Sequence, residues 1–263
     1  DKAEFIRSLT STMPPAPDHF GRCSDINRRG PALLADLPVM EGLRPEAFRE
    51  RMDPGKTVVL DARGFAAFGG MHVPGAWSVD LNGNFPTFAG WVLPTDRDIL
   101  LVAEDYEDAV EARTWARRVG VDRITGCLTG GVPAWAAAGL PTESVPLVST
   151  AELHDRICAG APMVLVDVRG RGEFKSSSIP GAVNIPAPDL RTRHVELDPE
   201  TLTVVICSTG NRSSLAASIL RQHGFRKLLN VGGGMTGYSA AGHAPQCTVC
   251  ENPHGSRTFA TAA

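Results

Sequence analysis

Residues 203–220 read TVVICSTGNRSSLAASIL, and this stretch decides the fold. Its β-branched run, Val204–Ile206, is typical of a buried strand. The apolar residues between positions 215 and 220 recur at the spacing of one apolar helical face. A short polar loop joins the two elements. The stretch therefore predicts a strand–loop–helix unit with Cys207 at the first loop position.

The loop places a thiol at the start of a helix, where unpaired backbone N–H groups favour negative charge. We therefore expect Cys207 to be substantially thiolate near neutral pH and to act as a nucleophile. Gly210 lets the backbone curl so that N–H groups converge on one point, and Arg212 adds a permanent cation for an anionic substrate. The predicted site consists of the catalytic pair Cys207 and Arg212 and of the substrate-binding loop residues Ser208, Thr209, Gly210, Asn211 and Ser213.

An internal repeat indicates the architecture. VVLDAR at 58–63 matches VLVDVR at 164–169, and VPGA at 73–76 matches IPGA at 179–182. GGVPAW at 130–135 matches GGMTGY at 233–238. Each unit alternates strands and helices, which predicts an α/β protein with two tandem domains, each a parallel sheet flanked by helices on both faces. In such sheets the ligand site lies beyond the carboxyl ends of the strands, where the Cys207 loop falls.

The spacing C-x4-R from Cys207 to Arg212, with DVR at 167–169 and IPGA at 179–182, resembles the rhodanese family of sulfurtransferases. Cysteine phosphatases have the longer spacing C-x5-R, which suits a tetrahedral phosphate, whereas a tighter ring suits a single sulfur atom. The resemblance implies transfer of sulfane sulfur from thiosulfate or a low-molecular-weight persulfide to a thiol or cyanide through a Cys207 persulfide. Two alternatives remain open: a protein-to-protein persulfide relay or binding module without small-molecule turnover, and a cysteine phosphatase.

The first unit lacks the predicted nucleophile. Ala103 stands at the position that matches Cys207, and Asp108 at the one that matches Arg212. The stretch 104–108 reads EDYED, and its four carboxylates would repel an anionic sulfur donor. We therefore expect the first unit to be inert and to shield part of the active-site mouth of the second unit.

Two residues beside the site have a predicted structural role. Asp167 and Arg169 flank the end of the first strand of the second unit. In rhodaneses the matching pair looks like scaffold, and we expect a hydrogen-bonded Asp–Arg pair here.

The sequence divides into four predicted parts: an N-terminal extension (1–41), an inactive rhodanese-like domain (42–143), a catalytic rhodanese domain (149–245) and a C-terminal tail (246–263). The extension resembles the segment that follows the metallo-β-lactamase-like domain in persulfide dioxygenases fused to rhodaneses, on the pattern Pro17, Phe20, Asn27 and Gly30-Pro31. It is therefore a possible remnant following a missing metallo-β-lactamase-like domain. The resemblance implies a persulfide dioxygenase domain or protein as a partner.

Composition limits the remaining functions. A net charge of −3 gives no reason to expect a nucleic-acid partner, and the absence of an apolar run of 18 residues predicts no membrane span. Six cysteines in 263 residues are too few for a disulfide framework, which favours a reducing, cytoplasmic location. In the tail, Cys247 and Cys250 could bind zinc with His243, accept sulfur from Cys207, form a disulfide, or stay disordered. A single C-x2-C is weak evidence, so we predict no metal and no cofactor.

Overall fold

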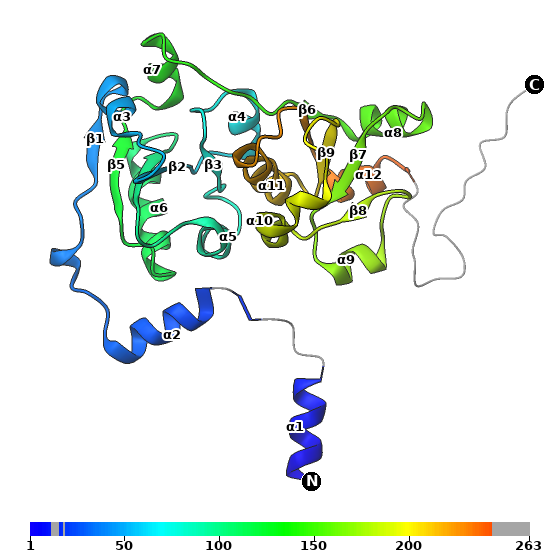
Figure 1. Cartoon of the computed structure of the whole chain (residues 1–263), viewed down its shortest axis with the longest axis horizontal. Helices are drawn as coiled ribbons and strands as arrows, with labels where there is room; N and C mark the ends of the chain where they lie inside the picture. The colour runs from blue at the N-terminus through cyan, green and yellow to red at the C-terminus, as the bar shows by residue number, and fades with distance from the viewer. Residues whose placement is uncertain (12–15, 18, 244–263) are drawn as a thin grey trace, which may run out of the picture.

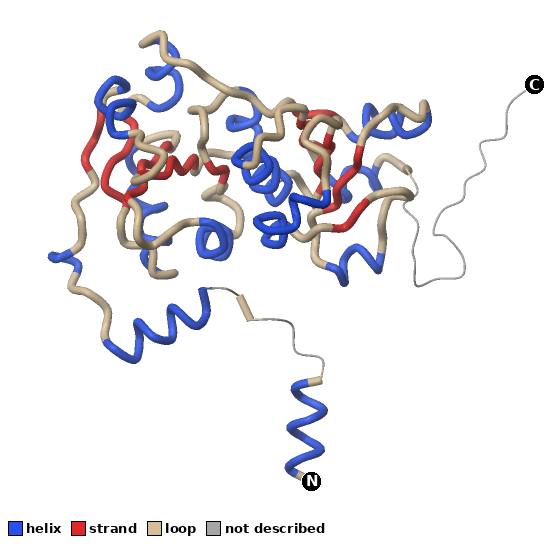
Figure 2. Tube along the Cα trace, in the orientation of Figure 1, coloured by secondary structure: helices blue, strands red, loops and turns tan. Residues whose placement is uncertain are grey.

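Two five-stranded parallel sheets, one per repeat, form the protein (Figure 1). The computed structural model describes residues 1–11, 16–17 and 19–243. The strand order is β1-β5-β4-β2-β3 in the first sheet and β6-β10-β9-β7-β8 in the second, so each strand of one unit has a counterpart in the other. Helices flank both sheets (Figure 2). The predicted α/β class with two tandem domains is confirmed.

The first unit follows an N-terminal segment of exposed helices. Its central strand β4 is buried along Ile99–Val102, as a parallel strand covered on both faces requires. Arg22 of the N-terminal segment donates to the carbonyl oxygen of Val119 from two guanidinium nitrogens, at 3.1 and 2.7 Å, and so ties this segment to the first unit. The elements are α1 (Lys2–Thr10), α2 (His19–Arg29), β1 (Glu41–Leu43), α3 (Pro45–Arg51), β2 (Thr57–Asp61), α4 (Phe65–Gly70), β3 (Trp77–Ser78), α5 (Phe85–Val92), β4 (Asp98–Val102), α6 (Tyr106–Arg118), β5 (Ile124–Leu128) and α7 (Gly131–Ala137).

The second unit repeats this order. The predicted strand at Val204–Ile206 lies in β9, the middle strand of its sheet, and all four residues of β9 are buried. The elements are β6 (Leu147–Val148), α8 (Thr150–Cys158), β7 (Val164–Asp167), α9 (Arg171–Ser176), β8 (Val183–Asn184), α10 (Leu190–Arg193), β9 (Thr203–Ile206), α11 (Asn211–Gln222), β10 (Leu228–Val231) and α12 (Gly234–Ala240). The exact limits of the two domains, 42–143 and 149–245, stay a prediction.

Helix α11 is buried on more than the one face that its sequence predicts. Every residue from Ser213 to Leu220 is buried. The extra face meets strand β3 of the first unit, where the backbone N–H of Ser78 donates to Ser218 Oγ at 3.1 Å and the hydroxyls of Ser78 and Ser214 lie 2.8 Å apart. Small polar residues on α11 thus allow the first unit to pack against it. In Figure 1, α11 lies beside α4 of the first unit. The helix that carries the site lies between the two units.

The helices of the described residues give no sign of a membrane span, since none has the length and apolar character that crossing a bilayer requires.

Candidate active site

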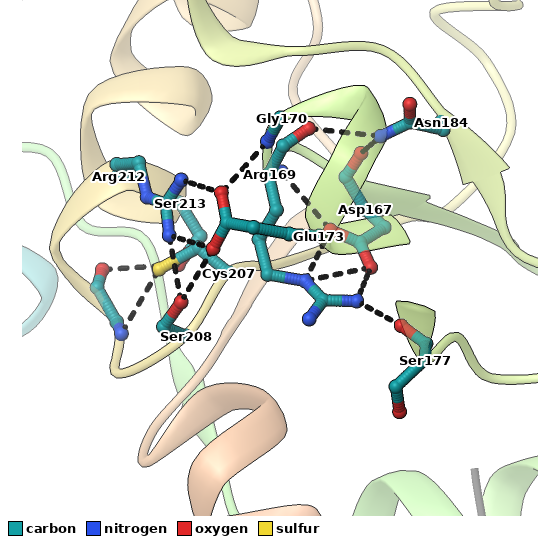
Figure 3. Close-up of polar contacts among 11 residues, drawn as sticks. Asp167, Arg169, Gly170, Glu173, Ser177, Asn184, Cys207, Ser208, Arg212 and Ser213 are labelled. Atoms are coloured by element: carbon teal, nitrogen blue, oxygen red, sulfur yellow. Dashed lines mark hydrogen bonds and ion pairs between the residues drawn. The ribbon is translucent and has the colours of Figure 1, made fainter. Parts of the chain in front are cut away.

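Cys207 follows β9 directly and lies at the centre of a cluster of hydrogen-bond donors. Its Sγ accepts the backbone N–H of Gly210 at 3.1 Å and the hydroxyl of Ser213 at 3.3 Å (Figure 3). Both donors belong to the start of α11, which favours negative charge. The side chain is only 1 % exposed, so the thiol lies below the surface of the loop. The arrangement can stabilise a thiolate and admits only a narrow reactant.

The start of helix α12 determines the path of the loop. Three successive loop carbonyls accept hydrogen bonds from backbone N–H groups at this helix start: Cys207 from Met235 (2.7 Å), Ser208 from Thr236 (3.0 Å) and Thr209 from Gly233 (3.1 Å). With its carbonyl groups bound on this side, the loop can direct the Gly210 N–H toward the sulfur. Two helix starts therefore shape the site: α11 faces the thiol, and α12 holds the loop.

Two glycines make these close approaches possible. A Cβ at Gly234, whose φ is +53°, would lie 2.3 Å from the carbonyl oxygen of Cys207. A Cβ at Gly210, whose φ is +129°, would lie 2.8 Å from the ring of Phe65 in the first unit. Both backbone conformations are strained for any residue with a side chain. The spacing predicts the role of Gly210, whereas that of Gly234 emerges only from the packing of α12 on the loop.

Arg212 is engaged by a partner that the sequence did not identify. Its guanidinium donates to both carboxylate oxygens of Glu173 on α9, at 2.6 and 2.8 Å, and to Ser208 Oγ at 2.6 Å (Figure 3). The backbone N–H of Gly170 donates to the same carboxylate at 3.0 Å. Hydrogen bonds from Arg212 lower the pKa of Glu173 from 4.5 to about 2, and the same hydrogen bonds raise the pKa of Arg212. Arg212 is therefore not the uncompensated cation that its position in the loop suggests.

Comparing the two repeats could have identified Glu173 as a site residue from the sequence. At the repeat offset of 106 residues its counterpart is Ala67, so the first unit lacks this carboxylate. The first unit also lacks the arginine. The two members of the pair are absent from the same unit, which is the pattern expected of side chains that act together.

The remaining loop residues lie at the junction with the first unit. The side chain of Thr209 is exposed, and that of Asn211 reaches to 3.0 Å from the position of a Cβ on Gly83. Among the described contacts, neither side chain hydrogen-bonds to the Cys207 thiol. Phe65 and Gly83 of the first unit thus border the loop, which fits the shielding role expected of that unit.

The predicted scaffold pair is confirmed. Arg169 Nε donates to both carboxylate oxygens of Asp167 at 3.0 Å, one terminal nitrogen donates at 2.6 Å, and the same nitrogen reaches the carbonyl oxygen of Ser177 at 2.5 Å. The first unit has the same arrangement in Asp61 and Arg63. The first unit has Ala103 in place of the cysteine and still keeps this pair, so the pair does not depend on the thiol and supports the fold at the strand end.

The loop of the first unit is one residue shorter than its counterpart. Two residues, 103 and 104, separate β4 from the N-cap Asp105, whereas three residues, 207–209, separate β9 from the N-cap Gly210. Counted from the caps, Glu107 rather than Asp108 therefore matches Arg212, and the sequence-based match was wrong by one position. The Asp105 side chain accepts the N–H of Asp108 at 2.8 Å and so caps its own helix.

Metal binding gains no support from the described part of the chain, in which no three His, Cys, Asp or Glu side chains form a cluster that could hold an ion. Cys247 and Cys250, and with them the tail predicted at 246–263, lie outside the described residues.

Comparisons with known proteins identify the family of both units. Residues 44–138 and 149–241 match the family model of the rhodanese-like domain. The chain is 39 % identical over 88 residues to the putative sulfurtransferase YtwF of Bacillus subtilis, a match that covers 34 % of this chain and 84 % of that protein. It is 32 % identical over 93 residues to the putative sulfur carrier protein YrkF of the same organism, covering 35 % of this chain and 50 % of that relative's length. A solved thiosulfate sulfurtransferase from Pseudomonas aeruginosa is 22 % identical, with a TM-score of 0.36 over 79 % of this chain and 43 % of that one.

Proposed function

Because the chain belongs to the rhodanese family, we propose that it is a sulfurtransferase in which the second unit carries the activity and the first is inert. One observation carries the proposal: the Cys207 thiol lies within hydrogen-bond distance of the Gly210 N–H and the Ser213 hydroxyl at a helix start. The relatives named as a sulfurtransferase and a sulfur carrier support the same chemistry.

The proposed reaction has two covalent steps. The Cys207 thiolate attacks the outer sulfur of thiosulfate or of a low-molecular-weight persulfide. The S–S bond of the donor breaks, and its electron pair leaves on sulfite or on a thiolate. Cys207 now carries the outer sulfur as a persulfide. An acceptor thiolate or cyanide attacks this terminal sulfur, and the Cys207 thiolate is regenerated.

The geometry favours sulfur over phosphoryl transfer. The outer sulfur of a donor is a single terminal atom, so it can reach a thiol that is 1 % exposed. A tetrahedral phosphate suits the wider ring of the C-x5-R spacing, whereas the loop from Cys207 to Arg212 has the tighter C-x4-R spacing. The cysteine phosphatase alternative therefore has less support than sulfur transfer.

The cellular setting stays a prediction. A reducing, cytoplasmic compartment would keep the Cys207 thiol available. A persulfide dioxygenase domain or protein is the partner that the resemblance of residues 1–41 implies.

Intact mass measurement after incubation with thiosulfate tests the proposal. We expect one added sulfur atom per chain, located at Cys207 by peptide mapping and removed by cyanide. Cys207→Ser should take up none, whereas Cys158→Ser, which changes an exposed thiol in the same unit, should behave as the wild type. Turnover with small-molecule donor and acceptor alone separates an enzyme from a relay, which would load sulfur but pass it only to a partner protein. Failure of Cys207 to take up sulfur from either donor would contradict the proposal.

A further inference from the structure

A cavity lies at the end of helix α11 that is far from the Cys207 loop. It has a volume of about 490 Å³, which is within the usual range for small-molecule sites. Gln222, the last residue of α11, lines it, whereas Asn211 begins the same helix beside the Cys207 loop. The 12 residues of α11 place roughly 18 Å between the two ends. The cavity is therefore separate from the site of sulfur transfer.

The cavity carries unbalanced positive charge. Arg49 of α3 and Arg97, just before β4, line it, and its lining contains no Asp or Glu. The Arg49 guanidinium has no hydrogen-bond or ion-pair partner among the residues that the structure describes. Arg97 donates one long hydrogen bond, 3.5 Å, to the carbonyl oxygen of Pro54. By contrast, the nearby Arg51 and Arg123 are each paired with a carboxylate. Two arginines that line one cavity, with no carboxylate in its lining, favour an anionic ligand.

Aromatic and aliphatic side chains form the rest of the wall. The half-buried indole of Trp77 on β3 lines the cavity, with the aliphatic side chains of Val58 and Val59 of β2 beside it. Trp135 is fully buried and donates its indole N–H to the carbonyl oxygen of Pro141 at 2.8 Å, so it supports the wall from behind. Indole faces pack well against flat rings. This lining suits the apolar body of a ligand as well as its charge.

Both units contribute to the rim. Gln222 of the second unit donates from Nε2 to the carbonyl oxygen of Gly75 in the first unit at 2.7 Å. Gly75 and Gln222 both line the cavity, so this hydrogen bond fixes one side of it. The cavity therefore depends on the packing of the two units, and no local motif in the sequence marks it.

We propose that this cavity binds a small organic anion with a flat ring. Arg49 and Arg97 hold the anionic group, and the ring packs on Trp77. The first unit thus supplies most of a binding site that is independent of sulfur transfer at Cys207.

Titration of the full chain with naphthalene-2-sulfonate, followed by calorimetry and tryptophan fluorescence, tests this assignment. We expect saturable binding at one site per chain. Naphthalene-2-sulfonamide, which has the ring without the charge, and inorganic sulfate, which has the charge without the ring, should each bind at least about tenfold more weakly.

Variants identify the site. Arg49→Gln and Arg97→Gln should each weaken binding of the sulfonate by about tenfold or more, because each removes a charge-assisted contact. Arg97→Lys keeps the charge and should retain most of the affinity. Arg44→Gln, an exposed arginine beside α3 that does not line the cavity, is the matched control and should bind as the wild type. Circular dichroism of each variant establishes that it is folded.

Three outcomes would overturn the assignment: no saturable binding of the sulfonate, equal affinity for the sulfonamide, or unchanged affinity in the folded Arg49→Gln and Arg97→Gln variants. Sulfur loading of Cys207, measured by mass on the same samples, should be the same in all variants. The cavity proposal can therefore fail while sulfur transfer stands, and the reverse.

Discussion

Replacing Arg212 by alanine tests whether this arginine holds the loop or binds the donor. The substitution removes two hydrogen bonds to Glu173 and one to Ser208 Oγ. It also leaves the Glu173 carboxylate without its counter-ion beside the thiol. We expect transfer from thiosulfate and from a low-molecular-weight persulfide to fall by a similar factor, because the shape of the loop is lost for both donors.

The exposure of the pair sets the magnitude. The side chains of Arg212 and Glu173 are 23 % and 43 % exposed. The pair therefore lies between exposed ion pairs, which contribute up to about 1 kcal/mol, and buried ones, whose disruption costs about 3–5 kcal/mol. We expect a coupling free energy of about 1–2 kcal/mol, which corresponds to about a 5- to 30-fold change in kcat/KM.

A double-mutant cycle with Arg212→Ala and Glu173→Gln measures this coupling with each donor. The double variant should lose less than the sum of the single losses. The exposed pair Arg156 and Glu152 on α8, joined at 2.9 Å, supplies a matched control cycle that should leave transfer unchanged. Two results would refute the reasoning: losses that add to within about 0.5 kcal/mol, or a loss with thiosulfate that the persulfide does not share. The second result would show that Arg212 binds the anion directly.

Further predictions concern the thiol, the acid range and the loop. Cys207→Ser should abolish sulfur loading and leave the urea midpoint near that of the wild type, since serine fits the same space; near-normal turnover would contradict the assigned nucleophile. Because the pKa of Glu173 is lowered from 4.5 to about 2, its carboxylate stabilises the fold fully above pH 4.5, and this stabilisation is lost as the pH falls through about 2. The difference in unfolding free energy between the wild type and Glu173→Gln, measured in urea, should therefore shrink over that pH range. A difference that stays constant would count against the ion pair. Gly234→Ala should slow loading by about 5- to 150-fold, because strain of about 1–3 kcal/mol falls on the Cys207 carbonyl. Gly242→Ala, also at positive φ but in open space, should leave loading unchanged. In a Cys207→Ser background, the variant Ala103→Cys should load no sulfur from thiosulfate. A variant in which the five residues 103–107 are replaced by the six residues of the wild-type loop 207–212 should load more sulfur than Ala103→Cys does. Sulfur loading by the single cysteine would show that the hydrogen-bond donors around Cys207 are dispensable.

The repeated strands could be predicted because their signals are local. The run Val204–Ile206 is both β-branched and apolar, and burial of β9 on both faces requires that composition. The Asp167–Arg169 pair could be predicted too, because its two members are separated by a single residue. Periodicity and short spacing are enough when the interacting groups are close in the chain.

The unpredicted features depend on contacts between distant segments. Glu173 lies 39 residues before Arg212, on another helix, and no spacing rule connects them. The second buried face of α11 exists only because the first unit supplies Ser78 as a partner. The sequence of α11 predicts the apolar face that packs within the second unit. It gives no sign of the face that packs against the first unit.

The two helix caps differ in what they place at the start of the helix. In the first unit the N-cap is Asp105, whose carboxylate accepts the N–H of Asp108 and so occupies the helix start with an anion of its own. In the second unit the N-cap is Gly210, which has no side chain, and a backbone N–H there is free to meet the Cys207 sulfur. A glycine cap is less stable than an aspartate cap by only a few tenths of a kcal/mol, roughly. The second unit therefore loses little local stability by leaving this helix start to the Cys207 sulfur, whereas the Asp105 carboxylate occupies the matching place in the first unit.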